Sequence, residues 1–470
     1  MSAESSYSEG VKKYIRRGET MEAAAAAERA MMRRMKFDTI AVRGLYGLEA
    51  AKANQGSINE PVYLSPAEVF EDSDHLESAL AYLIPSWTYT RYGNPTTGYL
   101  EETLALLESY GFEGKASACA TGSGNAAVFM ATHPFLVEYP GSLNNSAGKP
   151  NIVSSAKLYG GTFMLFSKRY SSERGVEVRW VCDPLDLDDW SSKIDENTRF
   201  VYGEMPSNPS LAVFDIAALA EVAHTHGIPL IIDATVATPA LMRPLLHGAD
   251  IVVHSVSKSM ATSGFAIAGA VIARGGIPSR VGPDEMRQDF AHYLKLLPFR
   301  DFGPAISPFN AIMVLNDLRT LRTRMDAQSR ATLQVARYLE GHPQVEAVWY
   351  PGLEASPGHA VAKRYLWLAD GQLETGEPVN RYGTLIGFTV RGGLAAARRV
   401  FDRFQLIWRA TDLGRIKSIA TIPSISTHQQ QGKAGRSLAD LPDNLIRLSI
   451  GGEHPVDIMA DLEQALALEG

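Results

Sequence analysis

Cysteine is scarce in this sequence: only Cys119 and Cys182 occur among its 470 residues. Two cysteines exclude a disulfide framework and a zinc site built on cysteine ligands, so we expect no metal centre. Scarce cysteine is also typical of a reducing compartment, and the cytoplasm is therefore the expected location.

Long apolar runs and an excess of positive charge are also missing. No stretch approaches the roughly 20 apolar residues that cross a bilayer, and Ala23 to Ala27 is too short for a signal peptide. The 45 Lys and Arg residues are outnumbered by 52 Asp and Glu, which gives a net charge of -7. An acidic average surface attracts neither nucleic acid nor an anionic membrane, so we expect neither as a partner.

The N-terminal region contains an alanine-rich segment, residues 22–35, that ends in Met31, Met32 and Met35 around Arg33 and Arg34. This composition favours a helix with one packed face and one solvated face. A second interpretation is an arm that lies on a partner subunit. The sequence alone leaves both interpretations open.

Short apolar runs alternate with helical periodicity between residues 115 and 255. The runs that predict strands are 116–119, 151–153, 200–202, 228–232 and 251–253. Between two of them, Asp215 is a plausible N-cap of a helix that Gly227 ends. Apolar strands separated by helices indicate an α/β fold with a mostly parallel sheet covered on both faces.

The pattern changes after residue 310. A long helical stretch at 310–339 is followed by strand-like runs at 345–350, 384–390 and 445–450 and by helical segments near 394–404 and 456–468. Residues 371–381, with their glycines and a proline, are typical of a surface loop. We therefore expect a second, smaller α/β domain in this part of the chain.

Polar residues follow three successive strands of the predicted sheet. Asn208 comes after the first, Asp233 ends the second, and Ser255, Ser257 and Lys258 follow the third. Ligands of parallel α/β sheets bind beyond the carboxyl ends of the strands. A single acid at a strand end is usually paired with a nearby cation or solvated, but an acid, hydroxyls and a lysine at three neighbouring ends favour a functional site.

Pyridoxal phosphate is a cofactor that uses these residue types together. Its aldehyde reacts with a lysine amine, and its ring nitrogen needs a carboxylate to stay protonated. Its phosphate binds backbone amides at a helix start, which Gly122-Ser123-Gly124 could supply, and hydroxyls such as those of Ser255 and Ser257. A glycine pair before a helix is a weak signal by itself.

Further motifs follow in order along the chain between about Phe37 and Leu468. They are Tyr89-Thr90-Arg91, Asn94-Pro95-Thr96, Ser123-Gly124-Asn125-Ala126-Ala127, Leu158-Tyr159-Gly160-Gly161-Thr162, Glu204 with Pro206 and Asn208-Pro209, His254-Ser255-Val256-Ser257-Lys258, Ser307-Pro308-Phe309-Asn310-Ala311, Thr427-His428 and Arg447-Leu448-Ser449. Together these stretches resemble the cysteine/methionine-metabolism family of pyridoxal-phosphate enzymes, which includes cystathionine γ-synthase, methionine γ-lyase and O-acetylhomoserine sulfhydrylase. The resemblance covers nearly the whole chain.

The resemblance implies an aspartate-aminotransferase-like (type I) fold, in which a smaller C-terminal domain and an N-terminal arm accompany the large domain. We accordingly expect an extension and arm contacting a partner subunit at 1–93, the large cofactor-binding domain at 94–309 and the small domain at 310–470. The implied partners are a small amino-acid substrate and further copies of the chain, as a dimer or tetramer with shared active sites.

Carried over by position, the resemblance assigns five roles around the reacting atoms. Lys258 would bind the cofactor covalently and Asp233 would pair with its ring nitrogen. Tyr159 would stack on the ring and assist proton transfer, and Asn208 would touch the ring hydroxyl. Arg447 would bind the substrate α-carboxylate as a bidentate fork.

The resemblance also assigns the phosphate ligands. Within one chain these would be the amides of Gly124 and Asn125 and the hydroxyls of Ser255 and Ser257. Two further ligands, Tyr89 and Arg91, would reach across to the phosphate of the neighbouring subunit. By contrast, we expect His254 and His428 to be structural, because a buried histidine is more often a hydrogen-bonding group than a catalyst.

Several segments look most like the O-acetylhomoserine sulfhydrylase branch, and Lys417 stands where synthases and lyases usually have Glu. The implied activity is γ-replacement on an O-acylated homoserine by sulfide, a thiol or another small nucleophile, through a vinylglycine-type intermediate. The alternative is a γ-lyase that cleaves methionine or a basic γ-substituted amino acid. A catalytically silent homologue and an aminotransferase are weaker hypotheses, because the lysine, the acid and the arm motifs are all present.

Departures from the branch pattern gather near the expected substrate pocket. Residues 261–265 read Ala-Thr-Ser-Gly-Phe where the branch has Gly-Gly-His-Gly, and Asp412 stands where Ser or Asn is usual. An acid at this position would repel an anionic substrate group unless Arg415 or Arg409 neutralises it, or it could favour a cationic one. We therefore predict Asp412 as a substrate-binding residue.

Overall fold

The computed structural model describes residues 7–137 and 149–467 of the chain. Its centre is a seven-stranded sheet, of which only β7 runs against the other strands. In spatial order the strands are β1 (Ala116–Thr121), β7 (Gly269–Arg274), β6 (Ile251–His254), β5 (Leu230–Asp233), β4 (Thr198–Glu204), β2 (Asn151–Ser155) and β3 (Glu177–Val181). The prediction of a mostly parallel sheet is confirmed.

Successive residues of the central strands point into two different cores. Ile231 and Val253 belong to one apolar cluster, whereas Ile232 and Val252 belong to the other. Because side chains alternate along a strand, strands that are apolar throughout must be covered on both faces. Helices α5 (Pro95–Glu108), α9 (Ile216–Thr225) and α10 (Thr238–Leu241) contribute to one cluster, and α6 (Gly124–Thr132), α7 (Gly160–Met164) and α12 (Phe290–Leu294) to the other.

The remaining α-helices of this part are α8 (Leu187–Ser191), α11 (Asp284–Gln288) and α13 (Arg300–Phe302), of which α8 and α11 contribute the buried Trp190 and Met286 to the two cores. The expected cap of α9 is present, because the Asp215 side chain accepts a hydrogen bond from the Ala218 amide. Gly227 follows the helix with a φ of +64°, a conformation that favours glycine.

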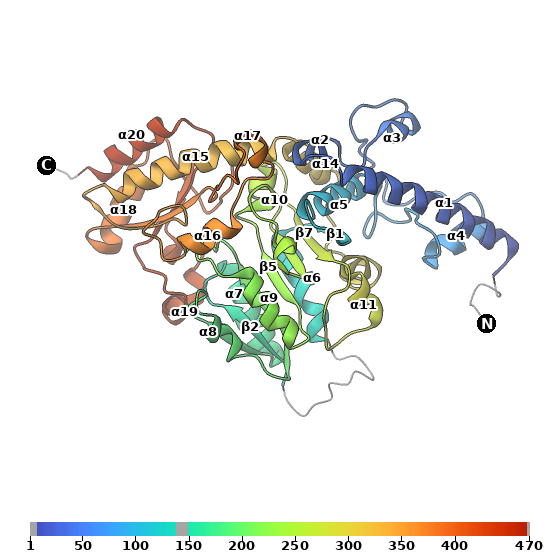
Figure 1. Cartoon of the computed structure of the whole chain (residues 1–470), viewed down its shortest axis with the longest axis horizontal. Coiled ribbons are helices and arrows are strands. Elements are labelled where there is room, and N and C mark those ends of the chain that lie inside the picture. Colours follow the sequence, from blue (N-terminus) through green and yellow to red (C-terminus); the bar gives the residue numbers. More distant parts are fainter. Residues whose placement is uncertain (1–6, 138–148, 468–470) are drawn as a thin grey trace.

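The predicted second domain is built on a five-stranded sheet in the order β10 (Trp408–Arg409), β11 (Ile419–Thr421), β12 (Ile446–Ser449), β9 (Leu385–Val390) and β8 (Val345–Trp349). Its helices are α15 (Leu321–Glu340), α16 (His359–Tyr365), α17 (Gln372–Thr375), α18 (Gly393–Arg403), α19 (Gly432–Leu438) and α20 (Pro455–Leu466). Helices α15, α18 and α20 pack together at the end of the molecule opposite the N-terminus (Figure 1).

Two expectations for this part need correction. The helical stretch at 310–339 is divided into α14 (Pro308–Leu318) and α15. The break at Arg319 frees its side chain to pair with Glu60 at 2.6 Å, and it leaves the Asp317 carbonyl to accept a hydrogen bond from Arg324. The expected loop at 371–381 contains the short helix α17, which is too short to give a helical period in the sequence.

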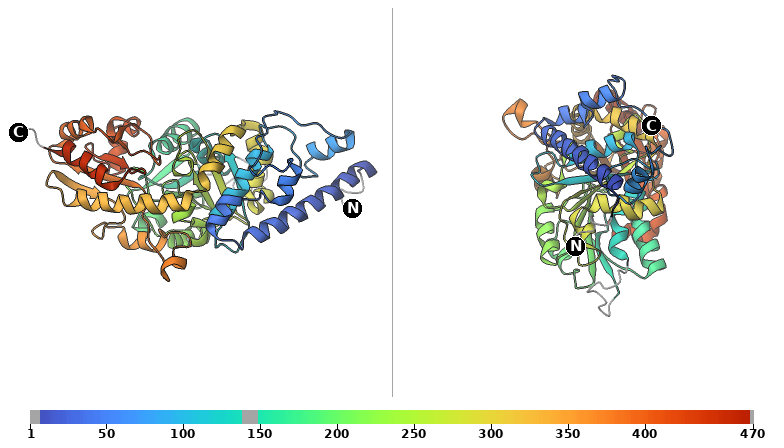
Figure 2. Two further views of the ribbon diagram at one scale, coloured as in Figure 1. Left: turned by 90° about the horizontal axis from the view of Figure 1, so that it is seen from above. Right: turned by 90° about the vertical axis from the view of Figure 1, so that its right-hand side faces the viewer.

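The N-terminal extension projects from the body (Figures 1 and 2). It contains α1 (Glu9–Met32), α2 (Phe37–Arg43), α3 (Leu48–Ala53) and α4 (Ser73–Leu80), and α1 packs along α4. The alanine run predicted to pack on one side does not do so: the buried residues of α1 are Val11, Tyr14, Gly18 and Met32, which flank the run. The middle of the helix, between the buried residues Gly18 and Met32, is therefore not buried.

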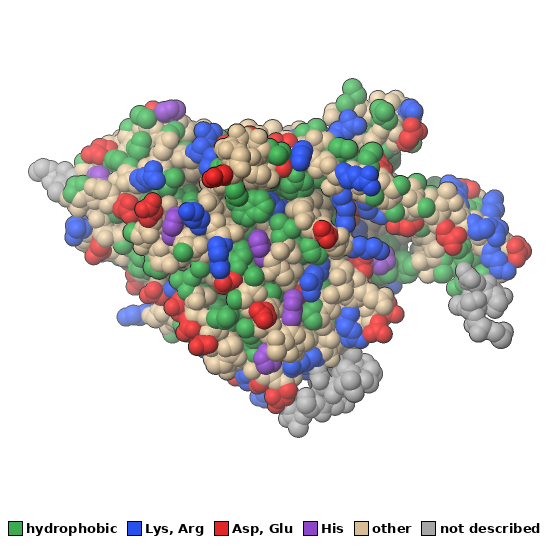
Figure 3. All heavy atoms as spheres, viewed as in Figure 1, with side chains coloured by type: hydrophobic (Ala, Val, Ile, Leu, Met, Phe, Trp, Pro, Cys, Tyr) green, Lys and Arg blue, Asp and Glu red, His purple; other side chains and the backbone are tan. Residues whose placement is uncertain are grey.

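The surface carries mixed charge. On the face shown in Figure 3, Lys and Arg side chains are interspersed with Asp and Glu over the main body. Within residues 7–137 and 149–467, no helix combines the length and the apolar character needed to cross a membrane.

Candidate active site

Lys258 lies in the loop that follows β6, where it meets a loop of the second domain, residues 410–418 between β10 and β11. Its Nζ atom is 2.7 Å from Oδ1 of Asp412. Burial by itself raises the pKa of Asp412, but the charge of Lys258 and the hydrogen bonds from Lys258 and Arg415 outweigh burial and lower it. Asp412 is therefore ionised and paired at neutral pH.

Arg415 completes this contact and ties the two loops together. Its Nε donates to Oδ2 of Asp412 at 2.5 Å. Its Nη1 donates to the carbonyls of Ser257 at 2.7 Å and Ala261 at 2.8 Å, which flank Lys258. Of the two arginines that could neutralise Asp412, the structure thus uses Arg415, whereas Arg409 donates to the carbonyl of Asp402.

Gly414 allows the two loops to approach each other closely. A Cβ atom at this position would lie 2.5 Å from the Ser259 amide nitrogen and 2.9 Å from the Lys258 carbonyl carbon. The φ of Gly414 is +73°, which also disfavours any other residue. The lysine loop therefore requires glycine at position 414.

Two buried carboxyl groups lie at the ends of β4 and β5. Burial raises the pKa of Glu204 well above its usual value, and the charge of Asp233 raises it further. Burial also raises the pKa of Asp233, with hydrogen bonds from Thr235 acting against it. Among the described residues no lysine, arginine or histidine side chain forms an ion pair with Asp233, whose oxygens accept from the Tyr202 hydroxyl at 3.4 Å and the Thr235 amide at 3.0 Å.

The start of α6 lies against the segment between β6 and Lys258. A Cβ atom at Gly124 would be 2.5 Å from Cβ of Ser255, so only glycine fits. The Ser123 hydroxyl accepts from the Ala126 amide, and the first amides of a helix, here Gly124 and Asn125, have no partner within the helix. These amides and the Ser255 hydroxyl form a cradle for an anion.

The hydroxyl of Ser257, which was also predicted to bind phosphate, is hydrogen-bonded to the backbone of Ala268. It donates to the Ala268 carbonyl and accepts from the Ala268 amide, both at 2.9 Å. The structure therefore places Ser257 next to Lys258 and gives its hydroxyl a role in fixing the loop.

Tyr159 lies at the N-terminal end of α7, with 36% of its surface exposed. Its amide donates to Glu204 at 2.7 Å, and its ring meets the ring of His428 edge-on at 6.5 Å. Burial raises the pKa of the Tyr159 hydroxyl, while the positive charge of Arg447 lowers it. Its ring also lies beside Asn125, because a Cβ at Gly161 would come within 3.2 Å of both its Cζ and the Asn125 side-chain nitrogen.

Arg447 is fully buried on β12 of the second domain. Its Nη1 donates to Oδ1 of Asn208 at 3.0 Å, and its Nη2 donates to the carbonyl of Asp412 at 2.7 Å. Its Nε has no partner among the described residues. A buried guanidinium with a free donor, next to Lys258 through Asp412, is suited to a carboxylate ligand.

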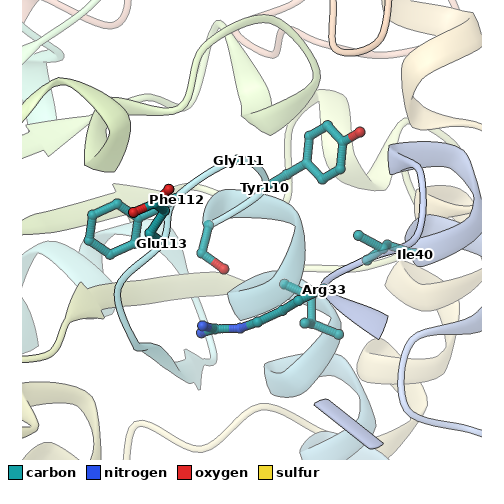
Figure 4. Close-up of a pocket in the computed structure, with 8 residues that line it drawn as sticks. Arg33, Ile40, Tyr110, Gly111, Phe112 and Glu113 are labelled. Carbon is teal, nitrogen blue, oxygen red and sulfur yellow. The ribbon is translucent and has the colours of Figure 1, made fainter. Parts of the chain in front are cut away.

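Tyr89 and Arg91 are not part of this cluster. The Arg91 guanidinium lies over the Tyr89 ring, 5.3 Å from its centroid, on the exposed arm. A separate hollow of about 220 Å³, lined by Arg33, Ile40, Tyr110 and neighbouring residues, also shares no residue with the Lys258 cluster (Figure 4).

Two site features were not among the residues predicted to bind. Glu204 fixes the amides of Tyr159 and Asn208, both at 2.7 Å, and the Thr235 hydroxyl accepts from the Ser255 amide at 2.7 Å. The signal for Glu204 was present, since it is an acid at the end of an apolar strand. The role of Thr235 depends on the spacing of β5 and β6, which the sequence does not display.

The site fits pyridoxal phosphate on observations of its own. A lysine amine held by Asp412, a buried carboxylate without a cationic partner among the described residues and a helix-start cradle that tolerates no Cβ lie in one crevice between the two domains. The two sheets and this crevice define a type I pyridoxal-phosphate-dependent enzyme.

Comparison with known proteins gives the family. The chain belongs to the family described as Cys/Met metabolism PLP-dependent enzymes, which matches residues 38–467. It is 35% identical over 463 residues to O-acetyl-L-homoserine sulfhydrylase of Leptospira meyeri, covering 93% of this chain and 98% of that one. It is 34% identical over 413 residues to L-methionine gamma-lyase of Fusobacterium nucleatum, covering 87% and 94%.

Solved structures agree with this assignment. A Campylobacter jejuni chain assigned as an O-acetylhomoserine (thiol)-lyase superposes with a TM-score of 0.80 at 31% identity, covering 92% of this chain and 100% of that one, and it contains N'-pyridoxyl-lysine-5'-monophosphate. Cystathionine gamma-lyase of Lactobacillus plantarum superposes with a TM-score of 0.75 at 28% identity, covering 92% and 98%.

Proposed function

We propose that the chain catalyses γ-replacement on an O-acylated homoserine, with sulfide, a thiol or another small nucleophile as the second substrate. One observation carries the proposal. Nearly the whole chain matches an O-acetyl-L-homoserine sulfhydrylase, and the residues that fit the cofactor and an amino acid converge on one crevice.

The cofactor, when bound, supplies a ring that withdraws electrons from the substrate Cα. We assign Lys258 to hold it and then to carry protons at Nζ. Asp233 would keep the ring nitrogen protonated, a role for which its burial without an ion-pair partner prepares it. Tyr159 would cover the ring, and the free Nε donor of Arg447 would help to orient the α-carboxylate, with Asn208 placing that guanidinium.

Within the described residues, the cradle at the start of α6 offers the amides of Gly124 and Asn125 and the Ser255 hydroxyl, and none of these groups is a cation. Gly124, Asn125 and Ser255 supply the contacts we assign to the phosphate, next to Ser257, whose hydroxyl is bonded to Ala268, and a phosphate dianion binds best where a guanidinium is also present. We assign that charge to the second subunit, whose arm would bring Tyr89 and Arg91 to the neighbouring site. The division into an arm at 1–93, a large domain at 94–309 and a small domain at 310–470 is part of the same proposal.

The surface of the arm supports self-association. In the described residues, 14 of the 27 exposed large hydrophobic side chains lie before residue 94. Exposed apolar side chains in such number mark a surface that another molecule covers. A dimer, or a pair of dimers, would cover them and complete the phosphate site.

A γ-lyase acting on methionine is the second candidate. The relatives described as L-methionine gamma-lyases are about as similar to this chain as the sulfhydrylases, at 34% and 35% identity. A basic substrate is less well supported, because Asp412 already pairs with Arg415 and Lys258. Both activities would use the same lysine, carboxylate and arginine, and they differ in whether a second nucleophile is required.

The test is a product assay with purified enzyme, pyridoxal phosphate and O-acetyl- or O-succinylhomoserine, with and without sulfide. We expect homocysteine and the free acid only when sulfide is present, and neither with Lys258→Ala. Methionine alone should give no 2-oxo acid; its turnover to a 2-oxo acid and ammonia would favour the lyase. Absence of acid release from every O-acylhomoserine would overturn the replacement proposal.

A further inference from the structure

The contact between Lys258 and Asp412 joins residues 154 positions apart in the sequence and links the two domains. The side chains are about equally half-buried, with exposures of 27% and 31%. The Asp412 carboxylate uses one oxygen for Lys258 and the other for Arg415. Both carboxylate oxygens of Asp412 therefore already have a partner within the protein, and neither is left for the substrate alone.

We propose that Asp412 and Arg415 are positioning residues for Lys258: Arg415 fixes the carboxylate and the lysine loop, and Asp412 orients the ε-amine and balances its charge when it is protonated. The inference deepens the proposed function and rests on it. It gives Asp412 a role that acts through Lys258, as an alternative to direct substrate binding.

The charge of Asp412 matters at one step of the proposed reaction. Lys258 Nζ would take up the proton of the breaking Cα–H bond, and the electron pair of that bond would be left for the bound cofactor to stabilise. The amine becomes an ammonium in this step. A carboxylate already at 2.7 Å stabilises that ammonium without reorganisation, which is the condition for electrostatic preorganisation.

Arg415 makes this arrangement compatible with a substrate carboxylate nearby. The backbone carbonyl of Asp412 holds Arg447, so the Asp412 side chain begins next to the expected carboxylate site. Without a counter-charge it would repel the substrate. Arg415 supplies that charge, and because it also binds the Ser257 and Ala261 carbonyls it cannot leave without loosening the loop that carries Lys258.

The first readout uses the cofactor-free enzyme and no substrate. Trinitrobenzenesulfonate reacts with uncharged amines, and mass spectrometry of the peptide containing Lys258 measures its labelling rate near pH 8. Asp412→Asn keeps the shape of the side chain but removes its charge, so we expect labelling about fivefold faster than in wild type, because the ammonium has lost its counter-ion. The matched control is Arg409→Gln, in the same region but bound to the Asp402 carbonyl, which should label at the wild-type rate.

The second readout separates positioning from substrate binding in the loaded enzyme. We expect Asp412→Asn to lower kcat about tenfold, with KM for the amino acid changed less than about twofold. A raised KM at unchanged kcat would assign Asp412 to the substrate and overturn the proposal, as would unchanged labelling of Lys258. If Asp412→Asn does not fold, Asp412→Ser gives the same two readouts.

The labelling result does not depend on the reaction. Failure of the enzyme to use any O-acylhomoserine, with faster labelling in Asp412→Asn, would overturn the proposed function and leave the contact with Lys258 supported. Normal activity in wild type, with equal labelling and equal kcat in the variant, would overturn only the positioning role.

Discussion

Glu204 and Asp233 occupy paired positions on the neighbouring strands β4 and β5. Both side chains are buried, with exposures of 4% and 7%, and burial raises the pKa of each. Ionising both carboxyl groups side by side therefore costs free energy. A protonated ring nitrogen next to Asp233 would offset that cost. The folded protein should therefore be more stable with the cofactor bound than without it.

Replacing Asp233 should separate stability from activity. A carboxyl group whose pKa is raised by folding costs stability once pH exceeds its unfolded-state pKa, so the cost is present at neutral pH and declines as pH falls. We expect cofactor-free Asp233→Asn to have a Tm equal to or above that of wild type, with the difference growing as the pH rises above the ordinary pKa of an aspartate, about 4. Activity should fall at least about 100-fold. A lower Tm for the variant at a pH above that value would contradict the account.

Gly414 offers a test of the contact between the lysine loop and the second domain. Gly414→Ala adds both backbone strain and a clash with the Ser259 amide, and we expect weaker cofactor binding and a loss of stability of about 2–3 kcal/mol. Gly432 is the matched control, since its φ of +67° is similar but nothing lies within 4 Å of its Cβ position. Gly432→Ala should lose about 1 kcal/mol and bind the cofactor normally. Spectroscopic titration with pyridoxal phosphate and chemical denaturation measure the two effects; equal behaviour of the variants would show that the clash is unimportant.

Shared active sites predict that two inactive variants restore each other. Lys258→Ala lacks the reactive amine, and Arg91→Ala lacks the guanidinium that we assign to the neighbouring subunit. After unfolding and refolding of an equal mixture, about a quarter of the sites should be intact, because half of the dimers are hybrids with one complete site each. Activity in the mixture should approach that fraction of wild type. If the activity of the mixture is no greater than the summed activities of the two variants refolded alone, Arg91 acts in the site of its own subunit or in no active site.

The buried pair of His254 and Glu108 should contribute to folding more than to catalysis. His254 Nε2 and Glu108 Oε2 are 2.8 Å apart, and both side chains are fully buried. Replacing one of the two residues leaves the other buried without its partner. Glu108→Gln and His254→Gln should therefore each lower the free energy of unfolding by about 3 kcal/mol. The double variant should lower it by less than the sum of the two single effects. Urea denaturation measures this cycle. The kcat of the folded variants should change less than about threefold; a large fall in kcat would show that His254 acts in the reaction.

Much of the fold could be predicted from local sequence. Strands such as Leu230–Asp233 are apolar at every position, which indicates a two-sided core without knowledge of the neighbours. Asp215 marked the start of α9 correctly because an N-cap acts within one turn. The break between α14 and α15 could not be predicted, because the helical pattern of the sequence continues through it; the partner of Arg319 at the break, Glu60, is far away in the sequence.

The residues of the site were likewise visible before their contacts. The order of Asp233, Ser255 and Lys258 at successive strand ends indicated pyridoxal phosphate, since parallel strands bring their carboxyl ends to one edge. The partners of those residues were not visible. That Asp412 faces Lys258, and that Arg415 rather than Arg409 neutralises it, depends on how the second domain packs against the lysine loop.

The sequence by itself therefore determined the class of fold and the cofactor, because these follow from periodicity and from ordered motifs, and it predicted which lysine would hold that cofactor. Only the tertiary structure decided which charges meet in the crevice, which hydroxyl is consumed by its own backbone and where glycine is obligatory. The physical reason is distance: hydrogen bonds and ion pairs act over about 3 Å, and residues such as Lys258 and Asp412 reach that separation only after two domains have packed.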